Sequence, residues 1–359
     1  MKIVIYGAGN NGKLVLELLD KYGLKSNVVG FADSIKKGEY LGLPIRSIDT
    51  LEKDTVFIIA IVNYNVVAAI CEKLKKDNFS HIYWFKHPRK VLMIGSFFEE
   101  QCTDCFFWEG CVLEQVEMHI MDACNLNCRG CAHFSPIFDK TIPDFQKRIR
   151  DVRCLKEKFD HIIRFYILGG EPFLNPEIGE YAKEIRRILP NTELYIVTNG
   201  LLIPQADAQV LEMIRNAKVR VSISEYKPTH EIINDISNRL EEFQILYEIR
   251  AYDSKQKFNL PLSLKEHEEP YCISNGCITI WNGKIARCPS LMYIHYFNDY
   301  FHTQYPEEGI LDLNDAPVKA ELLQFLKQEV KLCKYCGKSE IEWSVCGKKA
   351  TLCDFVADA

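Results

Sequence analysis

Three cysteines, Cys124, Cys128 and Cys131, stand close together in the stretch 122–134. Soft thiolates at such short spacing select zinc or an iron–sulfur cluster. A structural zinc site normally has four ligands, and zinc ribbons pair two Cys-x-x-Cys units, which this stretch does not contain. Three thiolates can instead hold three irons of a cubane cluster and leave the fourth iron free for another ligand. A plain zinc knuckle is the alternative.

A glycine pair followed by an acid adds a second motif at Gly169-Gly170-Glu171. Together with the Cys-x3-Cys-x2-Cys spacing, it resembles the signature of the radical S-adenosylmethionine (SAM) superfamily. In that family the open iron binds the amino and carboxylate groups of SAM, and an electron from the cluster cleaves SAM to a 5′-deoxyadenosyl radical that abstracts a substrate hydrogen. The resemblance implies a SAM-binding [4Fe–4S] cluster held by the three cysteines.

The resemblance also implies which residues contact SAM. The backbone of Gly169 and Gly170 and the carboxylate of Glu171 would hold the methionine ammonium by charge-assisted hydrogen bonds. Ribose or carboxylate contacts are expected at the ends of the following strands, from Thr198, Asn199, Ser222 and Ser224. Many members have an aromatic residue before the third cysteine, where this chain has Gly130. Adenine stacking is therefore expected from Phe134 or another residue.

A second group of cysteines lies in residues 261–359, which we call the tail. Its spacing resembles the auxiliary-cluster extension called SPASM, or the shorter form called twitch. That resemblance implies one auxiliary [4Fe–4S] cluster on Cys272, Cys288, Cys333 and Cys336. Two auxiliary clusters remain an alternative, which would draw on the left-over Cys277, Cys346 and Cys353, and Cys277 competes with Cys272 as a ligand. A structural zinc in the tail is the other alternative.

Cys102, Cys105 and Cys111 form a third group. We favour packing of these thiols among Phe106, Phe107 and Trp108, or a local structural role. A metal site or a share in a second auxiliary cluster stays open for them.

The N-terminal residues carry a different motif. A strand at residues 2–6 leads through Gly7-x-Gly9-x-x-Gly12 into a helix, and a second strand ends at Asp33. This is the order of a nucleotide-binding βαβ unit, in which glycines let backbone N–H groups approach phosphate at a helix N-terminus. The stretch also resembles the small N-terminal domain of sugar-modifying acyltransferases and polysaccharide-biosynthesis proteins. A Rossmann-like fold that only docks or dimerises is the alternative.

The strands and helices expected around these residues predict an α/β fold with four parts. We expect a Rossmann-like domain over residues 1–90, a cysteine-containing connector over 91–114, a radical SAM partial (β/α)6 barrel over 115–260 and a small twitch- or SPASM-like domain over 261–359. Barrel strands are expected at 116–121, 164–168, 194–198, 219–224 and 246–250. Active sites of such barrels lie at the C-terminal ends of the strands, where the motifs stand.

Composition narrows the class of protein. A formal net charge of −5 over 359 residues does not suggest nucleic acid or an anionic membrane as a partner. No apolar run reaches the length of a membrane span, and the N-terminus reads as a strand and not as a signal peptide. We therefore expect a cytoplasmic protein, in which the fifteen cysteines point to metal binding and not to disulfides.

These patterns predict a radical SAM oxidoreductase or epimerase. The substrate is expected to be a polar small molecule or carrier-linked compound of the sugar, amino-sugar or nucleotide-linked kind, and the electron donor a protein such as flavodoxin or ferredoxin. His133, beside residues 124–131, which we call the cluster loop, is a candidate catalytic base or equally a packed histidine. Modification of a ribosomal peptide or protein is one alternative. A non-catalytic iron–sulfur or zinc protein is another, against which the Gly-Gly-Glu motif argues.

Overall fold

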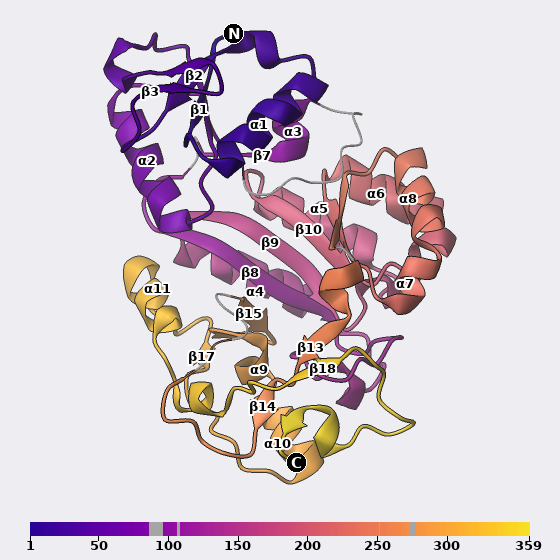
Figure 1. The fold of residues 1–359 in the computed structure, drawn as a ribbon. Coiled ribbons are helices and arrows are strands. Elements are labelled where there is room, and N and C mark those ends of the chain that lie inside the picture. The colour runs from indigo at the N-terminus through magenta and orange to yellow at the C-terminus, as the bar shows by residue number, and fades with distance from the viewer. Residues whose placement is uncertain (86–95, 106–107, 251, 271, 273–276) are drawn as a thin grey trace. The chain divides into compact units, whose positions relative to one another are not determined.

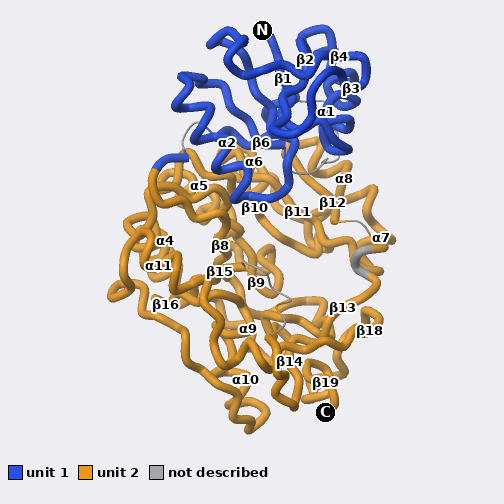
Figure 2. Tube along the Cα trace, turned by 60° about the vertical axis from the view of Figure 1, so that its left-hand side comes forward, with its two compact units in different colours: residues 1–109 blue, residues 110–359 orange. Residues whose placement is uncertain are grey.

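Alternating strands and helices build two large sheets, one in each of two compact units of the computed structural model (Figure 1), and two small two-stranded sheets, β13-β18 and β14-β19, complete the second unit. The units comprise residues 1–109 and 110–359 (Figure 2). The structure describes residues 1–85, 96–105, 108–250, 252–270, 272 and 277–359. The predicted α/β class is confirmed, while the predicted domain boundary near residue 90 lies outside the described residues.

Unit 1 contains a sheet whose strand order is β3-β4-β2-β1-β5-β6-β7. β1 is buried along its whole length and pairs in parallel with β2 and β5 on its two sides, as its run of apolar residues demands. The strands are β1 (Ile3–Tyr6), β2 (Val28–Ala32), β3 (Gly38–Tyr40), β4 (Leu43–Ile45), β5 (Val56–Ile59), β6 (Ile82–Phe85) and β7 (Cys102–Asp104). The helices are α1 (Asn10–Lys21), α2 (Tyr64–Lys76) and α3 (Phe97–Gln101).

Unit 2 contains a larger sheet with the order β12-β11-β10-β9-β8-β15-β16-β17. From β8 to β12 the strands are parallel neighbours in chain order, each reached through helical connections. These strands are β8 (Val112–Met121), β9 (His161–Gly169), β10 (Glu193–Thr198), β11 (Arg220–Ser224) and β12 (Tyr247–Arg250). The helices between them are α4 (Phe145–Lys158), α5 (Ile178–Ile188), α6 (Ala208–Asn216), α7 (Lys227–Glu231) and α8 (Ile233–Glu242).

The C-terminal residues extend this sheet instead of standing apart from it. β15 pairs in parallel with β8, on the side opposite β9, and β16 and β17 follow as antiparallel neighbours. These strands are β15 (Ile278–Trp281), β16 (Lys284–Ala286) and β17 (Leu311–Asp312). The remaining elements are β13 (Lys257–Asn259), β14 (Leu262–Ser263), α9 (Pro289–Met292), α10 (Ile294–Phe301), α11 (Lys319–Lys327), β18 (Glu340–Glu342) and β19 (Val356–Ala357).

The register of unit 2 brings the predicted motifs to one edge of the sheet. Met121 at the end of β8 lies opposite Gly169 at the end of β9, and Thr198 at the end of β10 lies opposite Ile223 in β11. Because parallel strands end at the same edge, the loops that follow them can share one site. No helix within the described ranges has both the length and the apolar character that crossing a bilayer requires.

Candidate functional site

The loop after β8 presents the three clustered cysteines to one cavity. Cys124, Cys128 and Cys131 all line a cavity of about 490 Å³ at the C-terminal ends of β8 to β11. In the described part of the chain, no group of three or more His, Cys, Asp or Glu side chains is gathered closely enough to hold a single metal ion. In a cubane cluster each thiolate binds a different iron, so its ligands need not surround one ion.

Nitrogen donors are directed at two of these sulfurs. Cys124 Sγ lies 3.4 Å from the backbone N–H of Leu126 and 3.8 Å from Asn199 Nδ2, and Cys128 Sγ accepts a hydrogen bond of 3.2 Å from Trp343 Nε1. Burial raises the pKa of Cys124 to about 11, and it raises the pKa of Cys128 well above its usual range. N–H donors favour the thiolate against this burial, and thiolates are the form that iron requires. The three residues therefore fit the cluster in number, type and environment.

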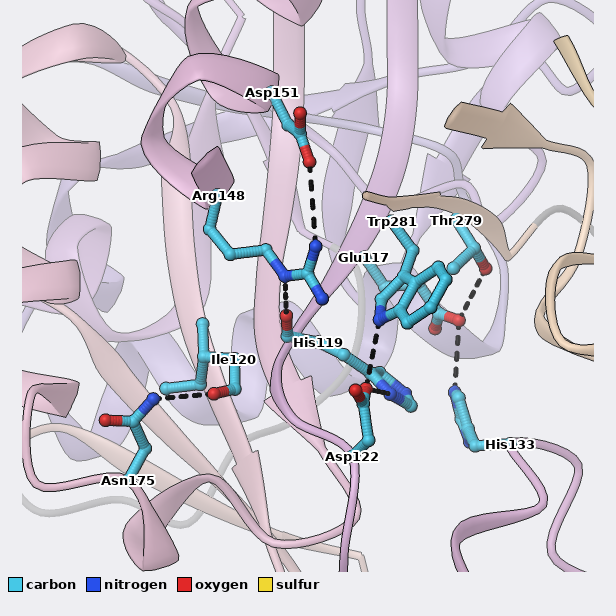
Figure 3. A network of polar contacts seen from close by, with 10 residues as sticks. All are labelled: Glu117, His119, Ile120, Asp122, His133, Arg148, Asp151, Asn175, Thr279 and Trp281. Atoms are coloured by element: carbon cyan, nitrogen blue, oxygen red, sulfur yellow. Dashed lines mark hydrogen bonds and ion pairs between the residues drawn. The ribbon is translucent and has the colours of Figure 1, made fainter. Parts of the chain in front are cut away.

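His133 follows the third cysteine and is held by an acid (Figure 3). Its Nε2 lies 3.1 Å from Glu117 Oε1, which also accepts a hydrogen bond of 2.8 Å from Thr279 Oγ1 in β15. Burial lowers the pKa of His133, but Glu117 and Cys131 outweigh burial and bring the pKa to about 10. Both Glu117 and His133 line the cavity, so the structure places the predicted catalytic residue in an ion pair at the site.

The glycine pair at the end of β9 lets two backbones meet without side chains between them. A Cβ on Gly169 would lie 1.9 Å from the carbonyl oxygen of Met121, and one on Gly170 would lie 2.3 Å from the carbonyl group of Ala123. Gly170 N donates to Met121 O at 2.8 Å. Glycine is therefore required at both positions for the cluster loop to leave β8 as it does.

Glu171 lies differently from its prediction. Its carboxylate is fully buried, is absent from the cavity wall and accepts hydrogen bonds from Phe173 N, Thr198 Oγ1 and Asn199 N at 2.7–3.0 Å. Burial raises its pKa to about 7, against the opposing effect of these hydrogen bonds. Glu171 thus ties the glycine turn to the end of β10, and its carboxylate does not face the cavity.

Three of the four strand-end residues predicted to contact SAM face the cavity, and the fourth is buried behind its wall. Thr198, Asn199 and Ser224 line the cavity, whereas Ser222 is buried outside it. Ser222 Oγ donates to Glu248 Oε1 at 2.9 Å and accepts from Arg250 Nε at 3.1 Å. The direct SAM contact predicted for Ser222 is therefore replaced by a role in orienting Arg250, which does line the cavity.

The structure contradicts the prediction that Phe134 stacks on adenine. Its ring is fully buried and packs against Phe297 and Phe355, at centroid distances of 4.6 and 5.7 Å, in the core of the C-terminal residues. This side chain anchors the cluster loop to the tail and is not available to a ligand. An apolar residue next to a motif can face a core or a ligand, and sequence alone does not distinguish the two.

Aromatic residues that sequence reasoning missed supply the cavity wall. Phe258 in β13 and Tyr226 before α7 both line the cavity, and their ring centroids lie 5.7 Å apart. Gly130 has φ +70°, and a Cβ there would lie 3.1 Å from the carbonyl oxygen of Asn259 and 3.4 Å from Phe258. Phe258 therefore packs over Gly130, the position where the family's aromatic residue is absent.

A buried polar network supports β8 beneath the cluster loop (Figure 3). Asp122 Oδ1 lies 3.0 Å from His119 Nδ1 and accepts a hydrogen bond of 3.1 Å from Trp281 Nε1. Arg148 Nε donates to His119 O at 3.1 Å. Trp281 and the Thr279 that holds Glu117 both belong to β15, so the tail helps to fix the residues that flank the cysteines. Sequence reasoning missed this network because its members come from distant segments.

Comparison with known families settles the class of this domain. Residues 118–270 match the family model of the radical SAM superfamily. The chain contains a radical SAM domain. The family predicted from the cysteine spacing and the Gly-Gly-Glu motif is confirmed, with all three cysteines and the motif inside the matched residues. Residues 2–74 match the PglD N-terminal domain, which confirms the Rossmann-like prediction for this part of the chain.

Individual relatives match less than half of this chain. GTP 3′,8-cyclase of Sulfurovum sp. (strain NBC37-1) is 25% identical over 133 residues, which cover 36% of this chain and 39% of that protein. GTP 3′,8-cyclase of Petrotoga mobilis is 28% identical over 142 residues, covering 39% of this chain and 42% of that protein. The chain thus spans about two fifths of the length of these curated relatives.

Solved structures resemble the chain only distantly. The complex of BtrN with AdoMet and 2-DOIA has a TM-score of 0.38 at 12% identity and covers 64% of this chain and 94% of that one. The complex of anSMEcpe with AdoMet and the Cp18Cys peptide has a TM-score of 0.31 at 17% identity, over 39% of this chain and 42% of that one.

The cysteines predicted to bind the auxiliary cluster influence one another electrostatically. Cys333 and Cys336 lie within electrostatic range of Cys288, because both raise the pKa that burial has already raised at this thiol. Burial, Cys333 and Cys272 raise the pKa of Cys336 to about 12. The Cys288, Cys333 and Cys336 thiols, and those of Cys336 and Cys272, thus lie close enough to raise one another's pKa. Whether they bind a cluster stays a prediction.

The left-over tail cysteines lie elsewhere. Cys277 lines the radical SAM cavity, where Gln115 Nε2 lies 3.9 Å from its sulfur. Cys346 is buried beside the cluster loop, and its backbone N–H donates to Asn127 O at 2.8 Å. Cys353 is exposed, with its thiol 3.4 Å from the carbonyl oxygen of Ala359.

In unit 1, close backbone contacts and hydrogen bonds fix the glycine turn at residues 7–12. Gly7 has φ +116°, and a Cβ on Gly12 would lie 2.1 Å from Gly7 O, whereas Gly9 faces open space. Asp33 accepts hydrogen bonds from the N–H groups of Ala8, Ile35 and Lys36 at 2.9–3.0 Å. Burial raises the pKa of Asp33, but these bonds outweigh it and hold the pKa below its usual range. The turn is thus built as predicted, and nucleotide binding there stays a prediction.

The third group of cysteines divides between the two units. Cys102 in β7 belongs to the core of unit 1, and Cys105 is fully buried there. Cys111 is half-buried at the start of unit 2, where its backbone N–H donates to Asp160 Oδ2 at 2.8 Å. Phe106 and Phe107, among which these thiols were expected to pack, lie outside the described residues.

Proposed function

We propose that this protein is a radical SAM enzyme that abstracts a hydrogen atom from a polar sugar, amino-sugar or nucleotide-linked substrate. One observation carries the proposal: the thiols of the cluster loop, the Gly169-Gly170 turn and several charged side chains line the same cavity. A protein that only stored a metal would not need an adjoining space of about 490 Å³ with strand-end polar groups around it.

When bound, a [4Fe–4S] cluster and SAM supply a 5′-deoxyadenosyl radical that abstracts a hydrogen atom from the substrate. Cys124, Cys128 and Cys131 would hold the cluster. Backbone groups of the glycine turn, with Asn199, would bind the methionine end of SAM, and Thr198 and Ser224, which line the same cavity, would contact its ribose or carboxylate. Phe258 and Tyr226 would provide the apolar wall for adenine in place of Phe134.

The rest of the cavity wall supports a polar substrate. Its lining includes Gln115, Glu117, Arg250, Lys257 and Asn259. Such a mixture of charged and amide groups matches hydroxyl, amino or phosphate groups better than an apolar side chain. The match of residues 2–74 to the PglD N-terminal domain, a type that resembles domains of sugar-modifying proteins, supports the same substrate class. The relatives named GTP 3′,8-cyclase agree with a nucleotide-linked substrate, over the third of this chain that they match.

Dehydrogenation and epimerisation differ in what happens to the substrate radical. In dehydrogenation the radical loses one electron and one proton, and an auxiliary cluster on Cys272, Cys288, Cys333 and Cys336 would accept the electron. In epimerisation the radical takes a hydrogen atom from a thiol, and one electron from the external donor and one proton from solvent convert the resulting thiyl radical back to the thiol. Cys277 lines the cavity and is the thiol placed for that step. A donor of the flavodoxin or ferredoxin type would supply electrons in both cases.

Reductive cleavage of SAM tests the proposed chemistry without a known substrate. The full chain is reconstituted anaerobically with iron and sulfide and incubated with SAM and dithionite. We expect 5′-deoxyadenosine from the wild type and none from Cys124→Ala. Cys154→Ala is the matched control, because this half-buried cysteine lies in α4 with its sulfur 3.4 Å from Asn314 Oδ1. Cys333→Ala should lower the iron content but spare cleavage. A cluster-loaded wild type that forms no 5′-deoxyadenosine refutes the proposal.

The reaction type is tested with nucleotide-linked sugars and free amino sugars in deuterated water. Epimerisation through Cys277 places solvent deuterium on carbon, and this label disappears in Cys277→Ala. Dehydrogenation gives a product that lacks a pair of hydrogens, with no deuterium on carbon. Conversion of a short peptide but of no sugar in the same assay overturns the substrate class.

A further inference from the structure

The last residues of the chain lie along the cluster loop. Segment 343–354 forms backbone hydrogen bonds with three loop residues: Arg129 N donates to Ser344 O at 2.9 Å, Cys346 N donates to Asn127 O at 2.8 Å, and Gly130 N donates to Asp354 O at 2.7 Å. Arg129 also forms an ion pair with Asp354 at 2.8 Å. The tail therefore holds the backbone between the first and third cysteines.

Trp343 begins this segment and reaches the sulfur itself. Its indole Nε1 donates to Cys128 Sγ at 3.2 Å. Its ring stacks on Tyr226 with centroids 5.7 Å apart and an interplanar angle of 19°. Its backbone N–H donates to Gln256 O at 2.6 Å. Three contacts thus fix the direction of the N–H group, and Cys128 is buried, so water does not compete strongly for the sulfur.

We propose that Trp343 raises the reduction potential of the cluster held by Cys128, and that the tail in this way controls how readily the radical SAM site accepts an electron. An N–H···S hydrogen bond withdraws electron density from a thiolate sulfur and so stabilises the more negative, reduced form of a cluster bound there. The inference rests on the proposed function, because it requires a cluster on the three loop cysteines. Trp343 is a positioning and tuning residue in this scheme and contacts no reacting atom.

Trp343→Phe separates this role from simple covering of the loop. Phenylalanine keeps an aromatic ring against Tyr226 but has no N–H group. Trp108→Phe is the matched control, because Trp108 is a buried tryptophan of unit 1 whose Nε1 has no hydrogen-bond partner among the described residues. Both variants are made in the full chain and reconstituted anaerobically beside the wild type.

The measurement is a redox titration followed by electron paramagnetic resonance, using the signal that changes when SAM is added. We expect Trp343→Phe to shift the midpoint potential of this signal to a more negative value, with unchanged iron content, while Trp108→Phe matches the wild type. An unchanged potential in a fully loaded Trp343→Phe protein overturns the inference. A wild type that forms no SAM-responsive cluster refutes the proposed function instead, which distinguishes the two failures.

A second protein covers the case in which Trp343→Phe does not load its cluster. The wild-type chain is produced with 5-fluorotryptophan, whose indole N–H is a stronger donor in a ring of nearly the same shape. The other three tryptophans of the chain are replaced as well, so a fluorinated Trp343→Tyr chain serves as the reference. We expect the potential of the labelled wild type to rise above that of the unlabelled protein by more than any shift in the reference. An equal or negative shift contradicts the inference.

Discussion

Replacing Gly170 by alanine should disrupt the packing of the glycine pair against the start of the cluster loop. The added Cβ would lie 2.3 Å from both the carbonyl carbon and the carbonyl oxygen of Ala123, and 2.7 Å from the carbonyl oxygen of Asp122. All of these are backbone atoms, so no side chain can turn away to relieve the contact. Ala123 directly precedes Cys124, and any shift of this backbone therefore displaces the first cluster ligand.

The size of the effect follows from these contacts. Overpacking of a tight interior typically costs about 1–3 kcal/mol. Moving the two backbone segments apart also breaks the hydrogen bonds from Gly170 N to Met121 O and from Glu171 N to Ala123 O. Each lost hydrogen bond costs about 1 kcal/mol. We expect Gly170→Ala to lower the free energy of unfolding by about 3–5 kcal/mol and to abolish SAM cleavage.

The assay compares urea unfolding, followed by circular dichroism, with iron content and 5′-deoxyadenosine formation. Gly347→Ala is the matched control. Apart from its two chain neighbours, Lys349 O at 3.9 Å is the one atom of the described residues within 4 Å of the added Cβ, and the stability of this variant should stay within about 0.5 kcal/mol of the wild type. If Gly170→Ala unfolds and cleaves SAM like the wild type, the close approach of the two strands is not required and the reasoning fails.

Three further predictions concern the support of the site. Burial raises the pKa of Glu171 from 4.5 to about 7, so between these two pH values the folded state holds a proton that the unfolded chain has released. The stabilisation by this group is therefore lost as the pH rises, and between about pH 5.5 and pH 8 the wild type should lose about 2 kcal/mol of unfolding free energy relative to Glu171→Gln. Parallel curves of unfolding free energy against pH for the two proteins would contradict this. Phe258→Ala should weaken SAM binding roughly fivefold through loss of ring stacking, measured by calorimetry on the cluster-loaded protein; an unchanged Kd assigns the adenine wall to another side chain. Thr279→Val should lower the free energy of unfolding by about 1 kcal/mol, because Glu117 loses its hydrogen bond; urea unfolding checks this, and Thr279→Ser, which keeps the hydroxyl, is its control.

The site residues that could be predicted from the sequence belong to short motifs, whose members lie close together along the chain. The cysteines of the cluster loop and the Gly169-Gly170 pair lie at strand ends, and strand ends can be recognised from apolar runs that stop at turn residues. The glycine turn after β1 follows the same logic, and its dense local contacts explain why a short motif was enough.

Contacts between segments that are distant in sequence could not be predicted in this way. Trp343 and Cys128 are 215 positions apart, and neither residue carries a signal that names the other. Phe134 and Phe258 are both aromatic residues near the cluster loop in space, yet one is buried in the core of the tail and the other lines the cavity. Burial is decided by which surfaces meet, and apolar character alone describes a core residue and a cavity wall equally well.

The sequence by itself determined the family of the central domain, the cysteines offered for its chemistry and the glycines that its strand ends require. Only the tertiary structure decided which residues surround that chemistry. It turned Glu171 and Ser222 toward the protein, placed Cys277 in the cavity and brought Trp343 to the sulfur of Cys128. The physical reason is that ligand type and spacing are local properties of the chain, whereas burial and hydrogen-bond partners depend on the packing of segments that are far apart in sequence.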